Sequence, residues 1–126
     1  MMRTIKFRGK DQAGIWHFGD LLHGENAIFI DDTYSEILGL ISPTKVLAET
    51  VGQFTGLLDK NSEEIYEGDI LRMDYPEWDH VVFWDDSQLK WAYRKVGEEQ
   101  SYSLVMNPMQ LSHYQIIGNI HDKQIL

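Results

Sequence analysis

The stretch TGLLDKNSEEIYEGDIL, Thr55–Leu71, combines turn-forming residues with closely spaced carboxylates. Its acidic side chains are Asp59, Glu63, Glu64, Glu67 and Asp69. The Gly68–Asp69 step near its end also occurs at Gly19–Asp20, within IWHFGDLL. The stretch is therefore either an acidic catalytic or metal-binding loop, or a turn that introduces a β-strand.

The Gly-Asp steps are typical of backbone turns. Glycine adopts positive φ without a steric penalty, so it can bend the chain sharply before a strand. An aspartate in such a turn accepts hydrogen bonds from nearby main-chain N–H groups and fixes the bend. We therefore expect Asp20 and Asp69 to hold strand entries and to take no part in catalysis.

The alternative is a metal-dependent hydrolase or nuclease that uses Asp59, Glu67 and Asp69. A divalent cation needs about six oxygen ligands around one point. The stretch lacks the spacing of an EF-hand loop, and in an extended chain Glu64 and Glu67 point to opposite faces. We expect no catalytic, cofactor-binding or metal-binding residue, and the hydrolase stays open as a second hypothesis.

Alternating apolar and polar residues predict strands along most of the chain. In TIKFRG (4–9), Ile5 and Phe7 alternate with lysine and arginine. VVFW and LKWAY flank the turn-forming residues 85–88 and predict a hairpin. Ser42–Pro43 resembles a helix start, which predicts at most one short helical turn after Pro43. The predicted fold class is all-β.

Two windows of the sequence share one pattern. FRGKDQAGIWHFGDLL (7–22) and FTGLLDKNSEEIYEGDIL (54–71) both run from Phe-x-Gly through an aspartate turn to Gly-Asp. Convergent use of glycine and aspartate in hairpins is the alternative explanation. Because 126 residues normally make one domain, we predict a single domain, 1–126. It is built from two small packed antiparallel units, 1–48 and 49–126, each opened by a similar hairpin.

The charge balance disfavours nucleic acid as a direct partner. The 11 basic and 20 acidic residues give a net charge of −9, whereas phosphate binding needs clustered lysine and arginine. Lys6, Arg8 and Lys10 would share one face of a strand. We interpret that face as solvated, and nucleic-acid binding through it stays open as a third hypothesis.

Composition narrows the remaining function classes. The chain has no cysteine, which excludes disulfides and thiolate chemistry. Its apolar runs are far shorter than the ~20 residues of a membrane-spanning helix, and no apolar run follows the basic residues near the N-terminus. We expect a cytoplasmic protein with no membrane association and no cofactor.

Histidine and tryptophan supply the last candidate site residues. The five histidines have no metal-ligand spacing, although His17 and His23 could approach each other across a bend. The tryptophans at 16, 84 and 91 fall in predicted strands and are expected in or beside the core. Trp78, in the loop YPEWDH, is expected to be exposed.

Three ordered blocks resemble the YopX family of bacteriophage and prophage proteins. They are RTIKFRGKD (3–11), ETVGQFTGLLDKNSEEIYEGDIL (49–71) and IIGNIHD (116–122). Members of that family often carry glycine at the position of Ser62. The resemblance implies a small all-β protein with a part similar to an SH3-like, partly open barrel. It supplies no catalytic residue, because no activity is established for the family.

These observations predict a non-enzymatic accessory protein of a phage or prophage that binds a macromolecule, most simply a protein of the phage or its bacterial host. Trp78 is the predicted contact residue. Open sheet edges favour pairing between copies, so a homo-oligomer is also expected.

Overall fold

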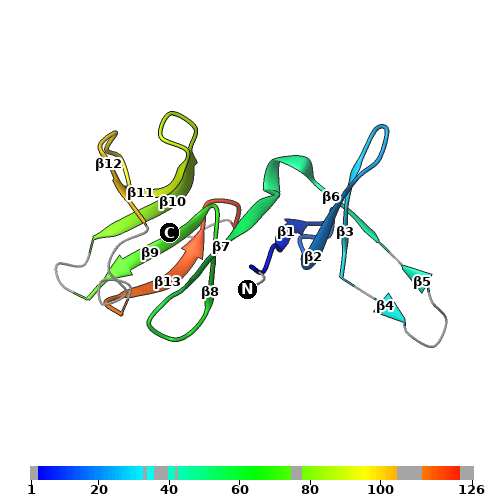
Figure 1. Ribbon diagram of the computed structural model, residues 1–126, viewed down its shortest axis with the longest axis horizontal. Helices are drawn as coiled ribbons and strands as arrows, with labels where there is room; N and C mark the ends of the chain where they lie inside the picture. Colours follow the sequence, from blue (N-terminus) through cyan, green and yellow to red (C-terminus); the bar gives the residue numbers. More distant parts are fainter. Residues whose placement is uncertain are drawn as a thin grey trace. The chain divides into compact units, whose positions relative to one another are not determined.

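The computed structural model describes residues 3–32, 34–35, 40–41, 43–74, 78–104 and 112–122, with the backbone alone at 34–35 and 40–41. The regular structure in these ranges is β-strand apart from one short 3-10 turn (Figure 1). The chain divides into two compact units, Met1–Phe54 and Thr55–Leu126. The all-β prediction is confirmed, and the division falls at 54/55, later than the predicted 48/49.

The first unit contains an antiparallel sheet and a two-stranded ladder. The sheet has the order β6-β3-β2-β1-β7, and the ladder joins β4 to β5. The strands are β1 (Phe7–Lys10), β2 (Trp16–His23), β3 (Ile28–Asp31), β4 (Tyr34–Ser35), β5 (Leu40–Ile41), β6 (Thr44–Val46) and the first part of β7 (Gly52–Leu58).

Ile30, Val46 and Phe54 are the buried apolar side chains among the described residues of the first unit. Val46 lies against β1, because a Cβ placed on Gly9 would be only 2.9 Å from Val46 Cγ2. The chain beyond β6 also returns to β1, where the Leu47 N–H donates to the Lys10 carbonyl at 2.7 Å. The small core therefore depends on a glycine that lets β1 and β6 approach.

Among the described residues, one short helical turn follows Pro43, as predicted, although it begins only after β6. It is η1 (Ala48–Thr50), whereas Pro43 directly precedes β6 and Ser42 lies outside the described residues. The Oγ1 of Thr50 accepts from the Lys10 N–H at 2.8 Å and donates to the Leu47 carbonyl at 2.6 Å. This contact with β1 fixes the turn at Thr50.

The second unit contains a five-stranded antiparallel sheet of order β12-β11-β10-β9-β13, preceded by neighbouring strands β7 and β8. Its strands are β8 (Glu64–Tyr66), β9 (Asp69–Met73), β10 (Asp79–Asp85), β11 (Lys90–Lys95), β12 (Ser101–Ser103) and β13 (Tyr114–Asn119). β13 returns to lie beside β9, from which it is far removed in sequence (Figure 1). The hairpin predicted around residues 85–88 is confirmed as β10 and β11.

One side of this sheet carries the larger core of the protein. The buried cluster is Ile65, Leu71, Val82, Tyr93, Leu104 and Tyr114. Burial of each large side chain contributes about 1.5–3 kcal/mol of transfer free energy. Both large sheets end in edge strands, so neither is a closed barrel, and the SH3-like detail stays a prediction. No helix among the described residues is long and apolar enough to cross a membrane.

Candidate functional site

Asp11 and Asp59 occupy the same position in two equivalent turns. The Oδ1 of Asp11 accepts from the main-chain N–H groups two and four residues later, at 2.9 and 3.0 Å. The Oδ1 of Asp59 accepts from the same relative positions at 2.8 and 2.9 Å. Each aspartate N–H also donates to the carbonyl four residues later. The repeat predicted from the two sequence windows is therefore present at the level of the turn.

The two Gly-Asp steps are not equivalent. Gly68 has φ of +91° between β8 and β9, and Asp69, only 2% exposed, accepts from the Tyr66 N–H at 2.7 Å. Gly19 and Asp20 instead lie within β2, and Asp20 is exposed. A Cβ on Gly19 would be 2.0 Å from the Asp31 carbonyl. The predicted role at a bend is confirmed for Asp69 and wrong for Asp20, where the glycine admits a neighbouring strand.

The carboxylates of the hydrolase hypothesis mainly bond to the main chain. Asp59 is buried, and its Oδ2 accepts from the Ile116 N–H at 2.9 Å in addition to the two bonds within its own turn. Glu67 lies in the turn before Gly68 and is half-buried. In the part of the chain that the structure describes, no group of three histidine or acidic side chains is arranged to hold a metal. Among the described residues, these carboxylates therefore do not form the set of metal ligands that the hydrolase hypothesis requires.

The basic face of β1 is not solvated, contrary to expectation. Arg8 is only 7% exposed, and its guanidinium carbon lies 4.7 Å from the centre of the Trp16 ring. Lys10 Nζ lies 5.6 Å from the same ring, and Lys6 Nζ lies 6.0 Å from the Phe54 ring. Cations attract aromatic faces in this geometry. The neighbouring strands supply rings that the β1 sequence alone does not reveal.

His17 bonds to a carboxylate at each ring nitrogen. Nε2 lies 2.8 Å from Asp11 Oδ2, and Nδ1 lies 2.7 Å from Asp32 Oδ2. Its hydrogen bonds to Asp11, chiefly, and then to Asp32 raise the pKa of His17 above its usual 6.5. The hydrogen bond from His17 lowers the pKa of Asp11. Sequence reasoning missed this arrangement, because Asp32 comes near His17 only through the pairing of β2 with β3.

The expected approach of His17 and His23 is wrong. Both lie on β2, which has no bend between them. Six residues of extended chain separate them by about 20 Å at ~3.3 Å per residue. The exposed His23 therefore cannot complete a site with His17.

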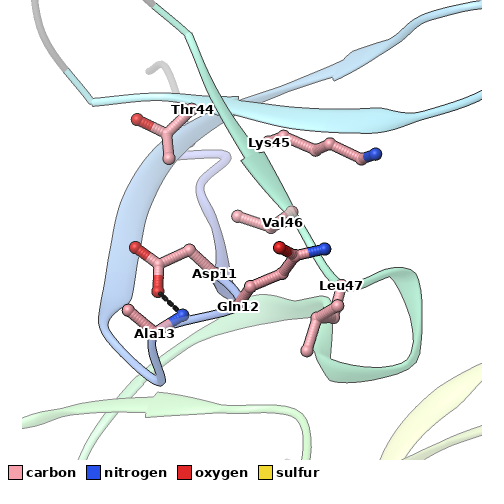
Figure 2. A pocket seen from close by; sticks show the side chains of 7 residues that line it. All are labelled: Asp11, Gln12, Ala13, Thr44, Lys45, Val46 and Leu47. Carbon is pink, nitrogen blue, oxygen red and sulfur yellow. Dashed lines mark hydrogen bonds between the residues drawn. The ribbon is translucent and has the colours of Figure 1, made fainter.

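An open pocket of about 420 Å³ lies between β6 and the β1–β2 turn (Figure 2). Its lining residues are Asp11, Gln12, Ala13, Thr44, Lys45, Val46 and Leu47. In Figure 2 the side chain of Lys45 points away from Asp11. Both oxygens of Asp11 are already engaged, by the turn and by His17. The lining therefore defines no class of ligand.

Trp78 is exposed, as predicted, with 48% of its surface accessible. Lys95 Nζ lies 4.2 Å from the centre of its ring. Val96, also exposed, follows Lys95 and donates its N–H to the Asp79 carbonyl at 2.9 Å. We call Trp78, Lys95 and Val96 the Trp78 patch.

The other tryptophans are less exposed than Trp78. Trp16 and Trp91 are half-buried, as expected. Trp84 is 38% exposed, more than expected, and packs edge-to-face on Trp91 with 5.1 Å between ring centres. Trp84 packs against the ring of Trp91, whereas the ring of Trp78 lies beside the Lys95 ammonium group.

Two of the sequence blocks that resemble the YopX family meet in the second unit. Asn119 lies opposite Asp69 in the β13–β9 ladder, and the Ile120 N–H donates to the Gly68 carbonyl at 2.9 Å. A Cβ on Gly68 would lie 3.2 Å from His121 Nε2. Glycine at this position therefore leaves room for the histidine of the last block.

A profile described as "YopX protein" matches residues 6–126, nearly the whole chain. The chain belongs to the YopX family. No curated protein matches it. Membership of the family assigns no activity to any of the residues described above.

Proposed function

We propose that this YopX-family chain is a non-enzymatic accessory protein of a phage or prophage, and that it binds another protein in the cytoplasm of the bacterial host. The observation that carries the proposal is the exposed ring of Trp78 within the Trp78 patch. A tryptophan left half-accessible beside a sheet contributes little to the core of the protein that carries it. Its large apolar surface can instead be buried by a partner.

Charged pairs lie around the patch. Arg72 Nε is 2.8 Å from Asp79 Oδ1, and Lys95 Nζ is 3.7 Å from Glu98 Oε1. An aromatic centre with a charged rim is the usual composition of a protein-binding surface. Because these ion pairs are partly exposed, they contribute more to the orientation of a bound partner than to the affinity for it.

The net charge of −9 favours a partner with a basic contact surface. The acidic chain and a basic partner surface attract each other at long range, and dissolved salt screens this attraction. The rate of association should therefore fall as the salt concentration rises, while the loss caused by removing Trp78 should persist at high salt.

The test is capture of partners by the tagged protein from phage-carrying bacterial cells, with Trp78→Ala as the variant. We expect the wild-type chain to retain a specific protein that the variant binds at least about 30-fold more weakly, the effect of removing a dominant interface tryptophan. Trp84→Ala is the matched control, because it also removes an exposed indole. Equal retention by the wild type and Trp78→Ala would contradict the proposal.

A homo-oligomer also remains part of the proposal. Mixing two differently tagged copies before capture separates self-association from binding of a foreign protein. Recovery of the second tag would identify the chain itself as a partner.

A further inference from the structure

The contacts of His17 join parts of the first unit that no strand pairing joins directly. The β2–β3 ladder ends at Asp20 opposite Asp31. Asp32 follows that last pair and bonds to one nitrogen of His17, while Asp11 of the β1–β2 turn bonds to the other. The three side chains are 17–24% exposed. One imidazole therefore connects the β1–β2 turn to the end of β3.

We propose that Asp11, His17 and Asp32 form a proton-operated latch that holds the end of β3 against the β1–β2 turn. The latch is closed when the imidazole carries a proton on both nitrogens. It opens when one of these protons is lost.

Hydrogen-bond chemistry requires the doubly protonated ring in the closed state. An ionised carboxylate only accepts, whereas a neutral imidazole has a single N–H donor. Two carboxylates at 2.7 and 2.8 Å from opposite nitrogens are satisfied together only by an imidazolium. After deprotonation one carboxylate would face a nitrogen lone pair.

Asp32 is the carboxylate that would leave. Asp11 is also held by the main-chain N–H groups of Ala13 and Ile15. Within the part of the chain that the structure describes, the Asp32 side chain bonds only to His17. Loss of the proton therefore releases Asp32, at the end of β3, and leaves the β1–β2 turn intact.

The surroundings of His17 favour the closed state at low pH. β1 presents Gly9 opposite His17, which adds no charge, and Lys45 of β6 points away from Asp11 (Figure 2). At the end of β3, Asp31 carries a further carboxylate whose buried Oδ1 has no hydrogen-bond partner among the described residues. The groups that act on His17 are thus mainly acidic, and the hydrogen bonds that His17 makes to Asp11 and Asp32 raise its pKa against the effect of burial.

The experiment is nuclear magnetic resonance on the full-length, ¹⁵N-labelled chain. The ring nitrogens of His17 report protonation, and the amide protection factors of Ile28–Asp32 report whether the latch is closed. We expect both ring nitrogens to be protonated at pH 5.5. The protection factors should fall about two- to fivefold as the pH rises through the His17 midpoint, the range for a partly exposed ion pair.

Asp32→Asn and His17→Gln are the decisive variants, and Asp86→Asn in an exposed turn is the control. Both latch variants should have low protection at pH 5.5 and no pH step, whereas Asp86→Asn should behave as the wild type. The proposal is overturned if the ring of His17 is neutral at pH 5.5. It is equally overturned if the step in protection persists in Asp32→Asn.

Discussion

Two non-glycine residues in the described ranges adopt positive φ, Ser62 at +62° and Leu89 at +54°. Ser62 takes the place in its turn that Gly14, at +83°, takes in the first turn. Each donates its N–H at 3.0 Å to the carbonyl of the aspartate three residues earlier. An L side chain in this conformation costs about 1–2 kcal/mol. Gly14, at the equivalent position of the first turn, avoids that cost.

Ser62→Gly should therefore stabilise the second unit. We expect the free energy of unfolding to rise by about 0.5–1 kcal/mol, because the relief of strain exceeds the entropy that glycine adds to the unfolded chain. Urea denaturation of the full chain measures the change. Gly14→Ser, the reverse substitution in the equivalent turn, should destabilise the first unit, and a fall in stability for Ser62→Gly would contradict the strain argument.

At the scale of elements, the turn that begins at Asp59 covers the edge of β13. The Lys60 N–H donates to the Tyr114 carbonyl at 2.9 Å, and Asp59 Oδ2 accepts from the Ile116 N–H at 2.9 Å. Uncovered edges invite pairing with other chains. The equivalent Oδ2 of Asp11 bonds to His17 instead. One turn motif thus protects a sheet edge in one unit and forms half of the latch in the other.

Asp59→Ala should be strongly destabilising. Three main-chain N–H groups would lose a buried, charged acceptor, and the expected loss is about 2–4 kcal/mol in the free energy of unfolding. Asp86→Ala, in the exposed turn of the β10–β11 hairpin, is the control and should change stability by less than about 0.5 kcal/mol. Urea denaturation distinguishes the two, and a loss below about 1 kcal/mol for Asp59→Ala would argue against the role assigned to it.

At the scale of the whole molecule, each unit contains a histidine with a shifted pKa, and the shifts are opposite. His80 is buried in the second unit, with ring centres 5.1 Å from Tyr93 and 5.9 Å from Tyr114. Burial lowers the pKa of His80, whereas the carboxylates around His17 raise its pKa. The free energy of unfolding changes with pH according to the difference in the number of protons bound by the unfolded and folded chains.

The two units should respond to pH in opposite directions. The contribution of His17 is fully present below about pH 6.5 and is lost as the pH rises through its raised folded pKa. The contribution of neutral His80 is kept above about pH 6.5 and is lost as the pH falls toward its lowered folded pKa. Amide protection read separately in β3 and β10 between pH 5 and 8 measures both trends. His80→Phe should abolish the acid sensitivity of β10 alone, and an unchanged response in that variant would assign the effect to another group.

Features that depend on neighbouring residues in the chain were predictable. The alternation of apolar residues predicts the β10–β11 hairpin, and the repeated aspartate turns were visible as two matching windows. The exposure of Trp78 follows from its place between turn-forming residues. Features that depend on distant strands were not predictable. Arg8 alternates like a solvated residue, and only the position of Trp16 on the adjacent strand explains its burial.

The sequence by itself determined the all-β class, the two aspartate turns and the family. Each of these rests on interactions within a few residues or on the ordered blocks themselves. Only the tertiary structure decided that Asp20 lies within a strand, that Asp59 covers β13 and that His17 meets Asp32. A side chain acquires its partners and its exposure from the strands packed against it, and those strands come from remote parts of the chain.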